Sequence, residues 1–239
     1  MKKQFNIILV LLISLIFLNK VSSQNEKIQK ILLKSLNAHG GEVSLNKIKQ
    51  IKYLKTTFTY NKVGDVKKRI KQHITHKFDP FITEIISDNK FLKTNGTSIE
   101  IIENGKIVDD LESLKNAKAS LDGAFYVFWQ PMKLKDSGTL IKYLGEITLP
   151  NKKNVHSLKI SYLNGKDIWK FYFDTSTYLL VATEVDHNNK ISLIYTTDFN
   201  TTPFGVFHHK RKSYNLTENR SKLTLQASYL YEILDVVKE

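Results

Sequence analysis

The sequence contains no cysteine among its 239 residues. This absence excludes a disulfide framework, catalysis by a thiol, and zinc or iron–sulfur sites with cysteine ligands. It also excludes a lipid anchor of the bacterial lipoprotein type, which needs a cysteine directly after the cleavage site, so we expect a free and soluble mature protein. Linkers, repeats and low-complexity segments are absent as well, which predicts a single domain.

Long hydrophobic runs are missing after the N-terminus, since no later stretch approaches the roughly 18 apolar residues that a transmembrane helix needs. The N-terminal run, Ile7 to Leu18, is short and follows Lys2 and Lys3. Val21 and Ser23 then occupy positions −3 and −1 of a small-residue cleavage site. The pattern predicts a signal peptide over 1–23, a mature start at Gln24 and one domain over 24–239; a retained N-terminal anchor is the alternative.

Acidic residues are scarce beside basic ones: 23 Asp and Glu against 36 Lys and Arg give a formal charge of +13. The signal peptide carries three lysines and no acid, so the mature chain keeps 13 minus 3, or +10. The basic residues gather in two predicted hairpins. The first holds Lys62, Lys67, Lys68, Arg69 and Lys71, and the second holds Lys210, Arg211, Lys212, Arg220 and Lys222. In an exported protein we expect such groups to meet anionic membrane surfaces and no nucleic acid; a merely solvated lysine-rich face is the alternative.

Motifs of catalysis are also lacking, because no HExxH, Walker loop or GxSxG is present. His73 and His76, three apart on a predicted strand, point to opposite faces, as do the adjacent His208 and His209, so neither pair can chelate a metal locally. We therefore predict no metal, no cofactor and no enzymatic activity. A hydrolase triad assembled from distant strands is an alternative that the sequence leaves open.

Two helices are predicted. Apolar residues spaced by three and four from Leu111 to Met132 give a helix over 108–132, with Asp109 or Asp110 as its cap and Pro131 at its end. Gly123 lies in its middle, as a point of bending or of close packing against a strand. A second helix covers 25–38 and stops at two glycines; we expect His39 to contact the last carbonyls of that helix.

The remaining segments have strand composition and are joined by short turns such as Asn95-Gly96, Asn104-Gly105 and Asn164-Gly165. They predict ten to twelve antiparallel strands in a single curved sheet, an open half-barrel of the mainly β (α+β) class, with the 108–132 helix covering its concave face. The predicted strands are 51–60, 66–76, 81–87, 90–94, 98–102, 140–149, 155–163, 168–174, 178–187, 191–199, 206–215 and 222–236.

Taken together, the segments 38–41, 125–132, 134–138, 169–174 and 178–180 give the chain a family resemblance. It resembles an exported Bacteroidetes family of unknown function related to the LolA/LolB lipoprotein carriers. The resemblance implies an open half-barrel whose apolar concave face is covered by helices and accepts acyl chains, as in those carriers and the sensor RseB. Many members carry a lipobox cysteine; its absence here favours a soluble carrier. No functional residue of the carriers matches a position in this sequence.

We therefore expect a soluble periplasmic or secreted protein that shelters a lipid, acyl chain or other apolar ligand between the sheet and the 108–132 helix. The aromatic residues expected to line that cavity are Phe125, Phe128, Trp129, Trp169, Phe171 and Phe173. Packing of these rings into a dry core is the alternative. A protein-binding or envelope-sensor module that uses the sheet face is the second hypothesis, and the hydrolase is the third.

Overall fold

The computed structural model describes residues 24–163, 165, 167–187, 190–217 and 222–239. The predicted signal peptide lies outside them. Residues 24–38 are helical and are followed by α2 (Glu42–Asn46), α3 (Leu111–Phe128) and α4 (Gln130–Lys133). In the part of the chain that is described, none of the helices has the length and apolar character needed to span a membrane.

Thirteen strands form one antiparallel sheet, which confirms the predicted mainly β architecture. The count exceeds the ten to twelve that we predicted, partly because a two-residue strand, β6, extends one edge. The strands are β1 (Ile48–Tyr60), β2 (Val66–Phe78), β3 (Phe81–Ser87), β4 (Lys90–Thr94), β5 (Ile99–Glu103), β6 (Lys106–Ile107), β7 (Thr139–Thr148), β8 (Asn154–Tyr162), β9 (Ile168–Asp174), β10 (Leu180–His187), β11 (Lys190–Thr202), β12 (Gly205–Leu216) and β13 (Leu223–Lys238).

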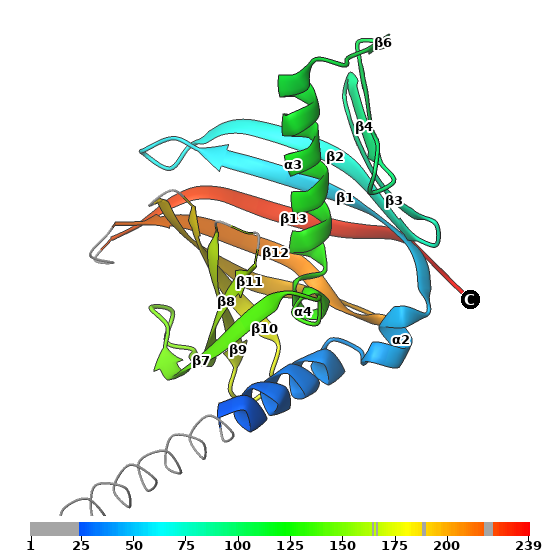
Figure 1. The fold of residues 1–239 in the computed structure, drawn as a ribbon. Helices are drawn as coiled ribbons and strands as arrows, with labels where there is room; N and C mark the ends of the chain where they lie inside the picture. Colours follow the sequence, from blue (N-terminus) through cyan, green and yellow to red (C-terminus); the bar gives the residue numbers. More distant parts are fainter. Residues whose placement is uncertain (1–23, 164, 166, 188–189, 218–221) are drawn as a thin grey trace, which may run out of the picture.

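The strand order explains why a helix crosses the sheet. The order is β6-β5-β4-β3-β2-β1-β13-β12-β11-β10-β9-β8-β7, so the first and last strands pair in the middle and the two mid-chain strands are the edges. The chain must therefore travel from one edge, β6, to the other, β7, and α3 and α4 make that passage. Figure 1 shows α3 lying across the curled sheet, with the 24–38 helix beneath it.

The start of α3 agrees with the prediction, and its end does not. The side chain of Asp110 caps the helix by accepting a hydrogen bond from the Ser113 backbone N–H at 2.9 Å. The helix ends at Phe128, before Pro131, and Trp129 separates it from α4. Pro131 stands in the first turn of α4, where a missing N–H costs nothing, so it helps to start a helix here instead of ending one.

His39 joins the 24–38 helix to the sheet, and our expectation that it contacts the helix's own last carbonyls was wrong. Its Nε2 accepts a hydrogen bond from the Leu180 backbone N–H at 3.1 Å, and its Nδ1 lies 2.7 Å from the carbonyl of Val206. Two glycines permit this close approach: a Cβ on Gly40 would lie 2.6 Å from the Cα of Gly205. The helix end is thus pinned to β10 and β12.

The face of the sheet that α3 contacts is called the inner face below. Over β1 to β5 it packs against α3 residues Ala117, Leu121 and Phe128. Over β8 to β10 it packs against the 24–38 helix, through residues such as Ile31. A third cluster, which includes Tyr172, lies on the other face of the same strands. Cavities on the two flanks of α3 adjoin the first two clusters, and these cavities are the candidate site.

Candidate functional site

The six aromatic residues predicted to line one cavity are divided between two core clusters. Phe128 and Trp129 belong to the cluster under α3 and are 2% and 4% exposed. Phe171 and Phe173 are fully buried beneath the 24–38 helix. Phe125 and Trp169 are only partly buried, and each borders a cavity. The structure therefore brings the six into two clusters, and four of them are core residues.

One cavity, with a volume of about 540 Å³, lies between α3 and the strands β8 and β9. Its aromatic wall consists of Tyr126, Tyr162 and Trp169. The rings of Tyr126 and Trp169 lie 5.1 Å apart, and the Tyr162 hydroxyl donates a hydrogen bond to that of Tyr126 at 3.0 Å. Burial raises the pKa of both phenols, so the pair is neutral at physiological pH. Three carboxylates complete the lining, those of Asp122, Asp136 and Asp167.

A second cavity, of about 300 Å³, lies between α3 and the other half of the sheet. Small residues of α3 form its roof, including Ala119, Ser120 and Ala124. Its floor comes from β1, β2, β3 and β13 and comprises Tyr53, Lys55, Gln72, Ile85 and Tyr231. Strand register explains part of this floor, because Lys55 is directly opposite Gln72 on one side and Tyr231 on the other. A further cavity of about 320 Å³, beside α2, is bordered by Phe125 and Trp129.

Gly123 borders both the 540 Å³ and the 300 Å³ cavities. It lies inside the uninterrupted helix α3, and a Cβ built on it would meet nothing within 4 Å. Close packing against a strand, one of our two explanations for this glycine, is therefore wrong. The other, a bend at Gly123, is also not supported, since the break in the helix falls at Trp129. What the missing side chain does is leave room on both flanks of α3.

Sequence reasoning missed Arg211, which we had placed in the second basic group. It is 1% exposed and points to the inner face. Its Nη2 donates hydrogen bonds to the Thr183 hydroxyl at 2.9 Å and to the Gln130 side-chain oxygen at 3.2 Å. A further hydrogen bond joins it to the Tyr231 side chain. The signal that could have revealed it is alternation along β12, where Arg211 and Ser213 share a face, away from Lys210 and Lys212.

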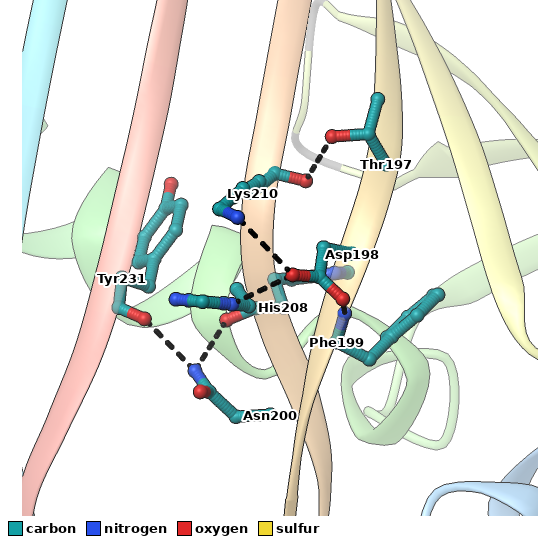
Figure 2. Close-up of polar contacts among 8 residues, drawn as sticks. Thr197, Asp198, Phe199, Asn200, His208, Lys210 and Tyr231 are labelled. Carbon is teal, nitrogen blue, oxygen red and sulfur yellow. Dashed lines mark hydrogen bonds and ion pairs between the residues drawn. The ribbon is translucent and has the colours of Figure 1, made fainter.

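The pairing of β11 with β12 is irregular near Arg211, and the Asn200 side chain holds the backbone in place there. Their pairing is interrupted between Thr196 and Asp198 and between Asp198 and Phe199. Figure 2 shows how the Asn200 side chain fills the resulting gap by donating to the carbonyls of His208, at 3.3 Å, and Tyr231, at 2.8 Å. Because the β12–β13 ladder ends at Lys210 opposite Leu230, the Tyr231 carbonyl would otherwise lack a strand partner on that side. Asn200 thereby positions Tyr231, a residue of the cavity floor.

Neighbouring side chains at this irregularity form an ion cluster on the surface. Asp198 Oδ2 lies 2.9 Å from His209 Nδ1 and 3.5 Å from Lys210 Nζ. Hydrogen bonding to His209 is the main reason why the pKa of Asp198 is lowered. His208 is buried instead and hydrogen-bonds with Thr196 at 3.2 Å, whereas His209 is only partly buried.

The other predicted pair behaves in the same way. His73 is exposed, whereas His76 is fully buried between the Tyr53 hydroxyl and the Thr83 hydroxyl, each 3.1 Å away. Burial lowers the pKa of His76 to about 3, so it stays neutral. Among the residues described, no group of three His, Asp or Glu side chains could hold a metal ion.

The basic residues of the first hairpin lie together on the surface. Lys62, Lys67, Lys68, Arg69 and Lys71 are all exposed. The register joins part of this group to the second: Arg69 is in line with Lys212 through Phe58 and Ser228, and Lys71 is in line with Lys210 through Thr56 and Leu230. Arg211 does not belong to this surface, and Arg220 lies outside the described residues. Four of the predicted residues, Arg69, Lys71, Lys210 and Lys212, thus form one basic surface on the outer face of β2, β1, β13 and β12. Lys68 is adjacent to Arg69 on β2 and points to the opposite face.

The fold and its cavities define the class of this protein: an open antiparallel sheet crossed on its inner face by a helix, with an open cavity on each flank of that helix. A family model described as a family of unknown function, DUF6503, matches residues 2–226, and the chain belongs to this family. A search of the curated proteins found no match.

Several solved structures align with this chain at low sequence identity. A DUF1329 family protein from Desulfovibrio piger aligns with a TM-score of 0.51 at 6% identity, covering 88% of this chain and 92% of that one. A LolA superfamily protein from Nitrosomonas europaea aligns with a TM-score of 0.45 at 8% identity, covering 88% and 93%. The Mycobacterium tuberculosis lipoprotein LppX gives a TM-score of 0.31 at 7% identity, covering 86% and 94%. At these identities the likeness concerns the fold alone.

Proposed function

We propose that this protein is an exported binding protein that shelters an apolar, lipid-like ligand between α3 and the inner face of its sheet, and that it catalyses no reaction on it. The observation that carries the proposal is Gly123, which borders cavities of about 540 Å³ and 300 Å³ on the two flanks of one helix. Such volumes are in the range of small-molecule sites, which span roughly 300–1,000 Å³. The kinship with the LolA/LolB carriers and a periplasmic location belong to the same proposal.

The aromatic wall of the larger cavity suits an apolar chain. Tyr126 and Trp169 offer ring faces toward the larger cavity, and the Tyr126 hydroxyl is already satisfied by Tyr162. A ligand that covers these rings need not break a hydrogen bond, so removing their apolar surface from water is a net gain of about 25 cal/mol per Å². The four core aromatics support the site from behind without lining it.

Gly123 also supplies the test, because a side chain can be added there without a clash. We expect Gly123→Trp to fill the space on the flanks of α3 and to weaken binding of an apolar fluorescent probe at least tenfold, with no loss of thermal stability. Gly123→Ala is the matched control: it should keep probe binding and gain about 1 kcal/mol of stability, since alanine favours a helix. Unchanged probe binding by a folded Gly123→Trp variant would disprove the site.

The natural ligand is sought by native mass spectrometry of protein purified without detergent. A co-purifying lipid, lost from Gly123→Trp and kept by Gly123→Ala, is the expected result. A stable protein partner in place of a lipid would favour the binding or sensor module instead.

The second part of the proposal concerns the basic surface on the outer face. Its exposed members Arg69, Lys71 and Lys212 lie across neighbouring strands and are suited to an anionic membrane, where each well-placed charge contributes about 1 kcal/mol. Sedimentation with anionic liposomes should decrease as salt rises. The variant Arg69→Gln/Lys71→Gln should bind less than Lys106→Gln/Lys115→Gln, which removes the same charge elsewhere. Equal binding by the two variants would show that this surface does not bind membranes and is only a solvated, lysine-rich face.

A further inference from the structure

Two cations face the inner side of the sheet close to the pairing of its first and last strands. Lys55 on β1 is opposite Tyr231 of β13, and Arg211 on β12 is opposite Tyr229 of β13. Because Tyr229 and Tyr231 are two apart on one strand, both cations lie on the same face. Lys55 Nζ is 5.4 Å from the centre of the Tyr229 ring and 6.0 Å from that of Tyr231. The two positive charges therefore flank a pair of tyrosines.

No acidic side chain neutralises them in the part of the chain that is described. The hydrogen-bond partners of Arg211 are the neutral groups of Gln130, Thr183 and Tyr231. Neither Lys55 nor Arg211 takes part in any ion pair found among the described residues. Burial lowers the pKa of both groups, and the charge of Arg211 lowers that of Lys55 further. Arg211 is buried and Lys55 is partly buried. Charge withdrawn from water without a counter-charge is costly, which is a reason to look for an anion from outside.

Further buried hydrogen-bond donors lack a partner within the described ranges. The Nε of Arg211 and the side-chain nitrogen of Gln130 are buried and have no acceptor among the described residues, and the same holds for the indole nitrogen of Trp129. Gln130 is in direct contact with Arg211 and is completely buried. These groups only donate, and buried donors in proteins are nearly always satisfied. What they lack is an oxygen acceptor.

Of these groups, Lys55 alone borders the 300 Å³ cavity. Lys55 and Tyr231 form part of the floor of the 300 Å³ cavity, while Ala119, Gly123 and Ala124 of α3 form its roof. An apolar chain lying under the small roof residues can reach Lys55, and Arg211 is linked to the same floor through its hydrogen bond to Tyr231. We propose that the ligand carries an anionic oxygen head group, a carboxylate or a phosphate, that Lys55 binds, with the positive charge of Arg211 behind Tyr231 adding to the attraction. This inference rests on the proposed function.

The experiment compares palmitate with methyl palmitate, which has the same chain but no charge, as competitors of an apolar fluorescent probe. Lysophosphatidic acid is the phosphate counterpart, and inorganic phosphate and acetate show whether a free anion suffices. We expect palmitate or lysophosphatidic acid to bind at least tenfold more tightly than the ester, and the free anions not to compete.

Variants assign the preference to the cations. Lys55→Met keeps a long side chain over the tyrosines and should remove most of the preference, whereas Lys55→Arg should retain it. The matched control is Lys52→Met, which removes an exposed lysine from the opposite face of the same strand. Thermal stability, measured on each variant, ensures that only folded protein is compared.

Failure of this inference differs from failure of the proposed function. If methyl palmitate binds as tightly as palmitate and lysophosphatidic acid, the apolar site stands and the anionic head group is refuted. A preference that survives in Lys55→Met and also in the second variant Arg211→Met, where this folds, refutes the assignment to these cations. If neither acid nor ester binds, both proposals are refuted. Competition by inorganic phosphate or acetate alone would show a site for small anions and overturn the lipid assignment.

Discussion

His39 should make the stability of this protein fall as the pH drops from neutral to about 4. The imidazole is 3% exposed and bridges the end of the 24–38 helix to the sheet. Because the Leu180 N–H donates to its Nε2, the proton must be on Nδ1, which donates to the Val206 carbonyl. Protonation of Nε2 would turn that acceptor into a donor facing another donor. The fold therefore requires the neutral ring.

The magnitude follows from the pKa. Burial lowers the pKa of His39 from 6.5 to about 4. Between these values the unfolded chain binds a proton that the folded chain does not, so stability is fully present above pH 6.5 and is lost as the pH falls toward 4. A pKa difference of this size corresponds to about 3 kcal/mol. Burial also lowers the pKa of His76 and of His208, and these histidines act in the same direction.

The assay isolates the contribution of His39 by comparing the stability of the wild type with that of a His39 variant. His39→Gln should be about 2–4 kcal/mol less stable than the wild type at pH 7, because buried partners lose their hydrogen bonds. In urea unfolding the gap between the two proteins should narrow by about 3 kcal/mol on going from pH 7 to pH 4, since only the wild type loses the His39 contribution. The exposed His73→Gln serves as the control, with no such narrowing. A gap that is the same at both pH values would refute the reasoning.

Three further substitutions test the fold. Gly40→Ala should lose far more stability than Gly41→Ala. Both glycines have positive φ, but only a Cβ at Gly40 would collide with the backbone of Gly205. Similar unfolding midpoints for the two variants would contradict this prediction. Phe128→Ala should lower the free energy of unfolding by about 3–5 kcal/mol in chemical denaturation, because the Phe128 ring stacks on that of Tyr53 at 4.3 Å. A small loss would mean that the Phe128 ring lines open space. Asn200→Ala should lose about 1–3 kcal/mol by freeing the carbonyl of Tyr231, compared with almost nothing for the exposed Asn215→Ala.

Much of the fold could be predicted from the sequence because local signals determine it. Asn104-Gly105 at a hairpin turn and the cap at Asp110 each act over a few residues. The pairing of β1 with β13 joins residues almost two hundred positions apart, and no local pattern encodes it. That one pairing determines which strands are edges and why α3 has to cross the sheet.

The candidate site was less predictable because its residues depend on that long-range pairing. Phe171 and Phe173 alternate with Lys170 and Tyr172, and alternation shows only that one face is buried, not whether a cavity adjoins it. Arg211 lies between two lysines, and composition alone placed it with them on the surface. Only strand register reveals that it faces inward beside the tyrosines of β13.

The strand order also explains how one helix can serve as the cover of a binding site. The cavity floor at Lys55 and Tyr231 comes from the first and last strands, which are held together by a long ladder of backbone hydrogen bonds. The roof comes from mid-chain, and α3 is joined to that floor only by side-chain packing, without any backbone ladder. Side-chain contacts separate at lower cost than a strand ladder, because each backbone group torn from a ladder must find another partner. Ligand entry is therefore expected to displace α3 and leave the pairing of β1 with β13 intact. Amide hydrogen exchange with and without ligand tests this expectation. Protection gained in α3 and unchanged in β13 would support it, and protection gained in β13 and unchanged in α3 would contradict it.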